Sequence, residues 1–252
     1  MRRRRTRMRA ATLMLAAALL TAAGCGGSGG ATTPAQREAA EKERAISSLL
    51  KDTDMGEEFE VDGSAMAYAG AQLARMRAQD PALSLTGTGT MLNDPCIRSA
   101  GGEPGLVAAA SAPKLTVPPD RAFILNQVFV YATERQAQAA AEIFTYDASH
   151  DCLAAVAERT MRRLTRRQRL TVAPGLARTL ELPEVGDSRF AFLVEVPMSK
   201  GTTRESYYGE YIVVQTGRAL NVTLTTAVAP PPDEAREFIA ERVADRLEDH
   251  YG

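Results

Sequence analysis

Three runs of sequence decide the fold: RFAFLVEV (residues 189–196), YYGEYIVVQ (207–215) and ALNVTLTT (219–226). In the first run, apolar residues recur at every second position, which is the period of a strand with one buried face. The other two runs are rich in β-branched and aromatic residues. Residues 216–218 (TGR) join them, and a short connection containing glycine fits a hairpin. The region therefore predicts three strands that follow one another in a sheet.

A further strand and three helices are predicted on either side of these runs. Residues 121–131 are apolar and rich in aromatic residues, as in a strand. A capping box of Thr133 and Gln136 then begins a helix, and small or apolar residues at three- and four-residue steps continue it to Val156 as one long helix. A Thr-Pro-Ala-Gln start predicts a helix over 34–51. After three prolines, an amphipathic helix over 235–247 is expected, with Phe238 on its buried face.

The pattern is mixed from residue 52 to residue 119. Residues 66–76 have the spacing of a helix face that ends before Pro81, and 87–119 are crowded with glycine and proline, which predicts mainly loop. The order of the clear elements is β, long α, β, β, β, α. It predicts an α+β fold, a mostly antiparallel sheet flanked by helices, in a single domain over 34–252.

The N-terminus has the order of a signal peptide. Residues 2–9 carry six arginines, and residues 10–23 are uncharged and rich in leucine and alanine. A basic segment before a short apolar run is typical of export signals. Because a permanent membrane helix needs roughly 20 apolar residues, this run is too short for one. We therefore expect residues 1–24 to be a signal peptide, with the general and twin-arginine export routes both open.

The signal ends in LTAAGC (residues 20–25), small residues directly before a cysteine, and this resembles the lipobox of bacterial lipoproteins. In that family the cysteine thiol carries diacylglycerol, and a peptidase cuts before it. The family usually has leucine three residues before the cysteine, where this chain has Ala22. The resemblance implies lipidation of Cys25. The alternative is an ordinary signal peptide cleaved at the same small residues.

The segment after Cys25 is rich in glycine and serine, so residues 25–33 are expected to be a lipidated, flexible tether of roughly 15 Å. Removal of residues 1–24 leaves 24 basic and 31 acidic side chains, a net charge of about −7. An acidic domain does not favour nucleic acid as a partner or electrostatic adhesion to anionic lipid. The membrane is therefore expected to be contacted through the acyl chains on Cys25.

Cys96 and Cys152 are the two cysteines that remain once Cys25 is assigned to lipid. A pair of cysteines in an exported protein enters an oxidising compartment, and a disulfide between them is the simplest outcome.

Two short phrases carry a resemblance to a family of domains. NQVFVYATE (126–134) leads from a strand into an alanine-rich helix with Cys152, and LPEVGDS (182–188) precedes a strand. Together with the closing strand, hairpin and helix, they make residues 40–250 similar to PknH-like extracellular sensor domains. These domains occur on actinobacterial receptor kinases and on stand-alone lipoproteins. The resemblance implies a sheet flanked by helices, a cleft for an extracellular ligand and no enzymatic activity. Typical members have two disulfides, whereas this chain can form one.

Four motifs could carry chemistry, and each also has a structural interpretation. His150 lies between Asp147 and Asp151, but neighbouring helix positions point in different directions, so a solvated helix face is expected. His250 is near the C-terminus. Gly186-Asp187-Ser188 resembles the start of a GDS-type hydrolase block, but Arg189 follows it, and a turn into the next strand is favoured. Asn221 begins an N-glycosylation sequon that is expected to lie on a strand.

Residues 159–169 contain six arginines. They could contact lipid head groups or an anionic cell-wall polymer. A solvated helix end, with cations near the negative end of the helix dipole, is the more common reason for such a run.

The sequence contains no phosphate-binding glycine loop, paired metal-ligand motif or credible catalytic triad, so we expect no cofactor, no metal and no enzymatic activity. The predicted function is that of a membrane-tethered extracytoplasmic lipoprotein with a ligand-binding or sensor-like domain. A lipid or glycolipid carrier and a structural lipoprotein are the alternatives. A cell-envelope ligand and a membrane signalling protein are the expected partners. The ligand-binding residues are not identified, and any cleft is expected between the sheet and its helices.

Overall fold

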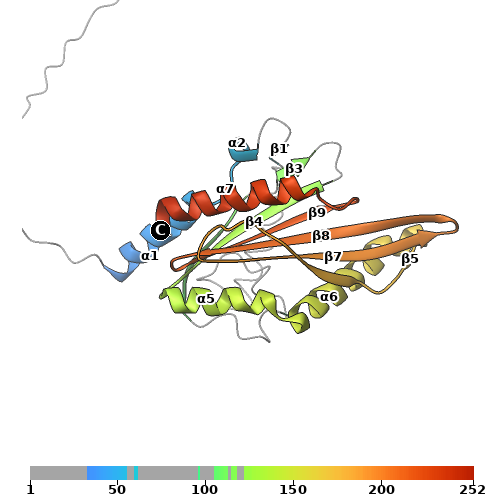
Figure 1. Cartoon of the computed structure of the whole chain (residues 1–252), viewed down its shortest axis with the longest axis horizontal. Coiled ribbons are helices and arrows are strands. Elements are labelled where there is room, and N and C mark those ends of the chain that lie inside the picture. Colours follow the sequence, from blue (N-terminus) through green and yellow to red (C-terminus); the bar gives the residue numbers. More distant parts are fainter. Residues whose placement is uncertain (1–32, 56–59, 62–95, 97–104, 113–114, 118–121) are drawn as a thin grey trace, which may run out of the picture. The chain divides into compact units, whose positions relative to one another are not determined.

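The computed structural model describes residues 33–55, 60–61, 96, 105–112, 115–117 and 122–252. Within these ranges nine strands form one antiparallel sheet, in the order β1-β3-β4-β9-β8-β7-β5, while β2 pairs with β4 and β6 pairs with β7 (Figure 1). The strands are β1 (Glu60–Val61), β2 (Leu106–Ser111), β3 (Leu115–Val117), β4 (Ala122–Tyr131), β5 (Thr171–Val172), β6 (Leu176–Leu180), β7 (Ser188–Lys200), β8 (Thr203–Thr216) and β9 (Ala219–Ala227). The helices are α1 (Pro34–Ser47), α2 (Asp52–Met55), α5 (Glu134–Glu142), α6 (Asp147–Thr165) and α7 (Asp233–Tyr251), with 3-10 turns η2 (Ile143–Thr145) and η3 (Arg166–Gln168).

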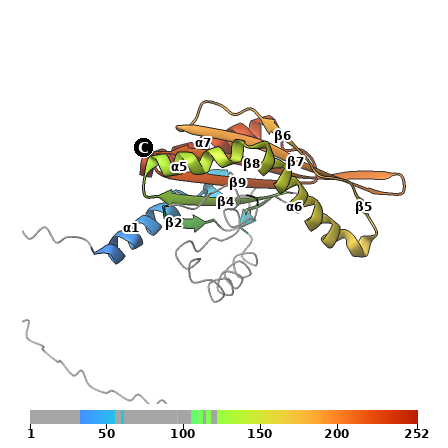
Figure 2. The ribbon, with the colours of Figure 1, turned by 90° about the horizontal axis from the view of Figure 1, so that it is seen from below.

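Helices cover both faces of the sheet, so the α+β prediction is confirmed. Helices α5 and α6 pack on one face, and α1 and α7 pack on the other (Figures 1 and 2). Because strand side chains alternate, β8 supplies Val213 to the α5/α6 core and Ile212 and Val214 to the α1/α7 core. A sheet buried on both faces explains why 207–226 reads as a nearly continuous β-rich run.

The three predicted strands are β7, β8 and β9, and a two-residue turn joins β8 to β9. Gly217 in this turn has φ +51°, and a Cβ there would lie 2.4 Å from the carbonyl oxygen of Tyr251. Its N–H donates to Asp187 Oδ2 at 2.7 Å. Only glycine meets both the backbone and the space requirement of this turn.

The two predicted helix starts are also confirmed. Thr33 and Gln36 form a capping box at the start of α1, and Thr133 and Gln136 form one at the start of α5. In each box the threonine hydroxyl oxygen accepts a hydrogen bond from the backbone N–H of the glutamine, at 3.3 Å. Both boxes are local signals, which is why the sequence located them correctly.

The prediction of one long helix over 133–156 was wrong. Helix α5 ends at Glu142, and α6 begins at Asp147 after an extended Tyr146 (φ −80°, ψ 127°). The Thr145 hydroxyl donates to the Glu142 carbonyl at 2.7 Å, and such local bonds compete with the continuation of a helix.

The prediction that 87–119 is mainly loop was wrong for two segments. Strand β2 pairs with one part of β4, with Ala109 opposite Phe129, and β3 pairs with another, with Leu115 opposite Ile124. Alanine has a low strand propensity, so β2 depends on the partner strand rather than on its own sequence. The helix expected over 66–76 lies outside the described residues.

The buried face of α7 differs from the prediction at two positions. Phe238 is 37% exposed and its ring lies 5.2 Å from the Arg242 guanidinium carbon, whereas Arg236 is only 6% exposed. Arg236 shares the inward face with Ala240, Val243 and Leu247 at three- and four-residue steps. The polar residue faces inward because β8 presents a buried acid to it, as described below.

Candidate functional site

The hairpin formed by β7 and β8 extends beyond the N-terminal end of α7 (Figures 1 and 2). Beside it lies a groove of about 870 Å³. We call it the hairpin groove, and its lining residues are Thr171, Ala173, Pro197, Met198, Ser199, Arg204, Glu205, Ser206, Tyr208 and Val228. They come from β5, β7, β8 and the segments that follow β5 and β9, and none belongs to a helix. This groove therefore does not lie where the sequence led us to expect a cleft, between the sheet and its helices.

A hydrogen-bonded set of side chains links the two strands of the hairpin beside the groove. Glu195 on β7 lies directly opposite Tyr208 on β8. Its Oε1 accepts from the Ser206 hydroxyl at 2.7 Å and from the Tyr208 hydroxyl at 3.3 Å. Because both hydroxyl protons are directed to Glu195, the hydroxyl oxygens of Ser206 and Tyr208 present lone pairs to a ligand that donates hydrogen bonds.

A buried ion pair follows on the same face of β8, two residues beyond Tyr208. Glu210 is 1% exposed, and its Oε2 lies 3.3 Å from Arg236 Nη1. Arg236 also donates to Asp233 Oδ1 at 2.7 Å and to the Glu181 carbonyl at 3.1 Å. One guanidinium thus joins α7, β8 and the segment between β6 and β7, which fixes the N-terminal end of α7 to the sheet.

Burial dominates the charge state of Glu210. Loss of solvent raises the pKa of this carboxyl to about 7, although the neighbouring Arg236 acts in the opposite direction. Glu210 Oε1 is buried and has no hydrogen-bond partner among the described residues. The guanidinium of Arg236 therefore compensates only part of the cost of burying this acid.

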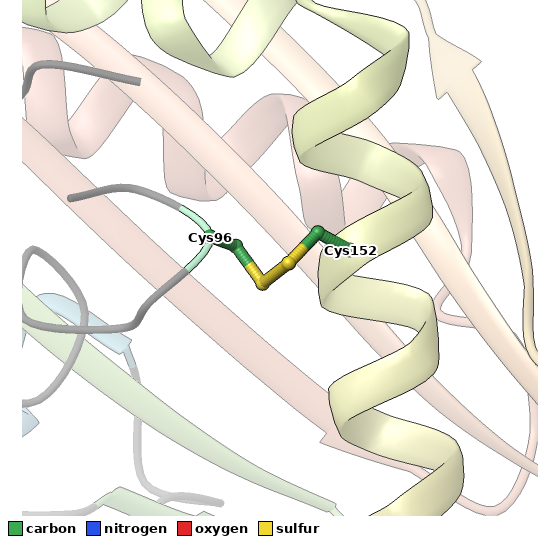
Figure 3. Close-up of a disulfide and its surroundings, with 2 residues drawn as sticks. All are labelled: Cys96 and Cys152. Carbon is green, nitrogen blue, oxygen red and sulfur yellow. A yellow bond between two sulfur atoms is a disulfide. The ribbon is translucent and has the colours of Figure 1, made fainter. Parts of the chain in front are cut away.

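Cys96 and Cys152, the pair predicted from the sequence, are joined by a disulfide in the structure (Figure 3). Their Cα atoms are 5.5 Å apart, and 56 residues separate them in the chain. Cys96 is 2% exposed and belongs to the core between α6 and the sheet, with Cys152 packed against the same core. Cys25, the predicted lipidation site, lies outside the described residues, as do the predicted signal peptide and most of the tether.

The prediction of a solvated position for His150 was wrong. This side chain is 6% exposed, its Nε2 lies 2.6 Å from the Phe144 carbonyl oxygen, and its ring stacks on Phe192 at 4.2 Å. It faces inward because the break at Tyr146 reorients the first turn of α6. Ser188 begins β7 and shares no hydrogen bond with His150, so the described residues do not assemble the GDS-type pair.

The other three candidates lie on α7, at the end of α6 and on β9. His250 lies in the last turn of α7, and the six arginines of 159–169 are exposed at the end of α6 and just beyond it. Asn221 is fully buried on β9, where its Oδ1 accepts from Asn126 Nδ2 at 2.8 Å and from the Thr223 hydroxyl at 2.9 Å. As expected, the sequon is part of a strand.

The described residues contain no candidate metal site and no candidate membrane span. No group of three or more His, Cys, Asp or Glu side chains there could hold a metal ion. None of the helices in these ranges combines the length and the apolar character that a membrane span requires.

Solved structures that are similar to this chain include an extracellular domain and a proposed enzyme. No protein-family model matches the chain, and no curated protein matches it. The extracellular domain of PknH from Mycobacterium tuberculosis is similar, with 12% identity and a TM-score of 0.44 over 82% of this chain and 96% of that one. A proposed thioesterase from Lactococcus lactis has 13% identity and a TM-score of 0.18 over 43% of this chain and 80% of its own. At these TM-scores neither similarity establishes a shared function, and membership of the PknH-like family stays a prediction.

Proposed function

We propose that this chain is a lipoprotein, tethered through lipid on Cys25 to the outer side of the cytoplasmic membrane, whose domain binds a polar ligand without catalysis. The hairpin groove is the observation that supports this proposal best. Six of its ten lining residues have polar side chains, and hydroxyl groups predominate among them. A groove in which polar groups converge beside apolar surface can hold and orient a polar ligand.

The lining favours this function over the carriage of lipid. A carrier needs a pocket lined almost wholly by apolar side chains, because each buried methylene of an acyl chain must leave water. In the hairpin groove the apolar part consists of Ala173, Pro197, Met198 and Val228. This apolar surface can take part of a ligand, while the six polar side chains beside it would be left facing the methylenes of an acyl chain.

The cysteines support an extracytoplasmic location. A disulfide such as Cys96–Cys152 persists in an oxidising compartment and is rare in the cytosol. The basic and apolar segments before Cys25 provide the export signal that such a location needs.

Filling the groove should abolish binding. Thr171 is exposed at its edge, so Thr171→Trp places an indole in the groove without removing any hydrogen bond described above. Thr179→Trp on β6 is the matched control, since Thr179 is exposed but does not line the groove. We expect calorimetric titration with polar envelope fragments, beginning with peptidoglycan disaccharide-peptides, to show at least about tenfold weaker binding for Thr171→Trp alone. Equal binding by both variants, or tight binding of a phospholipid instead, would contradict the proposal.

Lipidation can be tested separately at the N-terminus. Mass spectrometry of the mature protein should find diacylglyceryl cysteine at residue 25, and Cys25→Ala should move the protein from the membrane fraction to the soluble fraction. A mature N-terminus upstream of Cys25, without added lipid mass, would refute the assignment.

A further inference from the structure

Basic residues gather at one end of the sheet, which we call the basic end. It combines the last turns of α6, η3 with the segment that follows it, and the tip of the β7–β8 hairpin. Pairing of Thr171 with Ser199 and of Val172 with Met198 brings the last two parts together. The residues are Arg159, Arg162, Arg163, Arg166, Arg167, Arg169, Lys200 and Arg204, and all eight are exposed.

Most of the cations of the basic end lack an acidic partner among the described residues. Arg162 forms an ion pair with Glu158 at 2.9 Å, and the other seven form none with a described residue. In contrast, Arg218, Arg236 and Arg246 each pair with a carboxylate. The sequence contains no acidic residue in 159–172 or in 199–204, although acidic residues outnumber basic ones in the predicted mature chain.

The helix dipole explains only part of this cluster. Arg162 and Arg163 lie in the last turn of α6, where the negative end of the dipole favours cations. Arg166, Arg167 and Arg169 follow the helix. Lys200 lies at the end of β7 and Arg204 near the start of β8. Because one ion pair, Arg162 with Glu158, compensates only a small part of the mutual repulsion of these charges, an external anion would relieve it further.

We infer that the basic end binds a linear polymer that carries phosphate groups. Guanidinium groups bind phosphate oxygens through paired N–H donors, and an array of them along one end of a molecule matches a chain of repeated negative charges better than a single small anion. Thr171 and Ser199 pair where the segment after η3 meets the β7–β8 hairpin, and both line the hairpin groove. Their hydroxyls are additional donors.

The position of the basic end favours a polymer over the membrane surface. Helix α1 begins at the opposite end of the sheet, in both views (Figures 1 and 2). The predicted tether joins the domain at the start of α1. In this step alone the inference rests on the proposed lipid anchor. A tether attached at the opposite end of the sheet leaves the basic end free to reach material that lies further from the bilayer.

The test uses the full chain in a nonionic detergent and long-chain inorganic polyphosphate on a biosensor surface. The basic-end variant replaces Arg163, Arg166, Arg167 and Arg204 with glutamine. The control variant makes the same change at Arg37, Lys42, Lys51 and Arg135, which are exposed, remote in sequence and without ion pairs to described residues. Circular dichroism and thermal unfolding establish that both variants fold. For about four neutralised phosphates, a rise from about 50 to about 200 mM NaCl should weaken wild-type binding about 50-fold.

We expect the basic-end variant to bind polyphosphate at least about tenfold more weakly than the wild type. The affinity of the control variant should stay within about twofold of the wild type. An equal loss in both variants would mean that net charge alone is responsible and would overturn the inference. So would an absence of wild-type binding at about 50 mM NaCl. A competition experiment distinguishes a phosphate polymer from lipid head groups as the source of phosphate. Free polyphosphate and micelles containing phosphatidylglycerol each compete with the polyphosphate on the surface for the protein. More effective competition by the micelles, at equal phosphate concentration, would assign the basic end to the membrane instead.

Discussion

Replacing Arg236 with methionine is expected to lower the free energy of unfolding by about 3–5 kcal/mol at pH 8. The substitution keeps most of the side-chain volume but leaves the carboxylate of Glu210 buried without its cation. It also removes the donors to Asp233 and to the Glu181 carbonyl. Chemical denaturation, followed by far-ultraviolet circular dichroism, measures the difference.

The effect should depend on pH. Burial raises the pKa of Glu210 from 4.5 to about 7 in the folded protein, against the influence of Arg236. Between these values the folded state binds the proton more tightly than the unfolded state, so this group lowers the free energy of unfolding as pH rises. Without Arg236 the pKa of Glu210 rises further, so the decrease in the free energy of unfolding continues to higher pH. At pH 5 Glu210 is protonated, and the loss in Arg236→Met should fall to about 1–2 kcal/mol.

The double variant Arg236→Met with Glu210→Gln is the control. It removes both charges, and we expect its free energy of unfolding to lie within about 1–2 kcal/mol of the wild type at both pH values. A loss in Arg236→Met that is the same at pH 5 and pH 8, or that Glu210→Gln does not relieve, would show that Arg236 acts by packing alone.

Removing the Cys96–Cys152 disulfide should lower the free energy of unfolding by about 4 kcal/mol. The bridge spans 56 residues of sequence, and closing so long a loop restricts the unfolded chain strongly. The double variant Cys96→Ala with Cys152→Ala avoids a leftover thiol. Its unfolding in urea is compared with that of the wild type under oxidising conditions.

A reducing agent provides the control for this experiment. It should destabilise the wild type by a similar amount and leave the double variant unchanged. If the double variant unfolded within about 1 kcal/mol of the oxidised wild type, the bridge would not restrict the unfolded chain in the expected way.

Features that depend on neighbouring residues could be predicted from the sequence. The alternation of 189–196 predicts β7, and the capping boxes at Thr33 and Thr133 mark the starts of α1 and α5. Each signal lies within a few residues of the element that it specifies. The buried face of α5 also follows, since alanine recurs at helical spacing along it.

Features that depend on distant partners could not be predicted. The alanine-rich β2 is a strand because β4 lies beside it. Arg236 is buried, and Phe238 half-exposed, because Glu210 on β8 requires a cation at that point. No pattern within 233–251 carries information about a carboxylate more than twenty residues earlier in the chain.

The hairpin groove belongs to this second class. Thr171, Ser206 and Val228 come from segments widely separated in the sequence, and none of them stands in a recognisable motif. Only the pairing of β5 and β8 with β7 brings Thr171 and Ser206 to one place. A sequence signal existed in the serines, threonines and tyrosines of 199–208, but it indicates a polar hairpin without indicating what lies beside it.

The position of β9 between β4 and β8 has a consequence for the biogenesis of the protein. Its pairing with β4 joins Asn126 to Thr223, 97 residues apart, and residues near the C-terminus thereby complete the middle of the sheet. A nascent or partly translocated chain that ends before residue 219 has two long strands with unpaired edges at its centre. Such edges invite intermolecular pairing and proteolysis. The domain can therefore acquire its native structure only after nearly the whole chain has emerged. Until then its unpaired strand edges are exposed to proteases and to pairing with other chains.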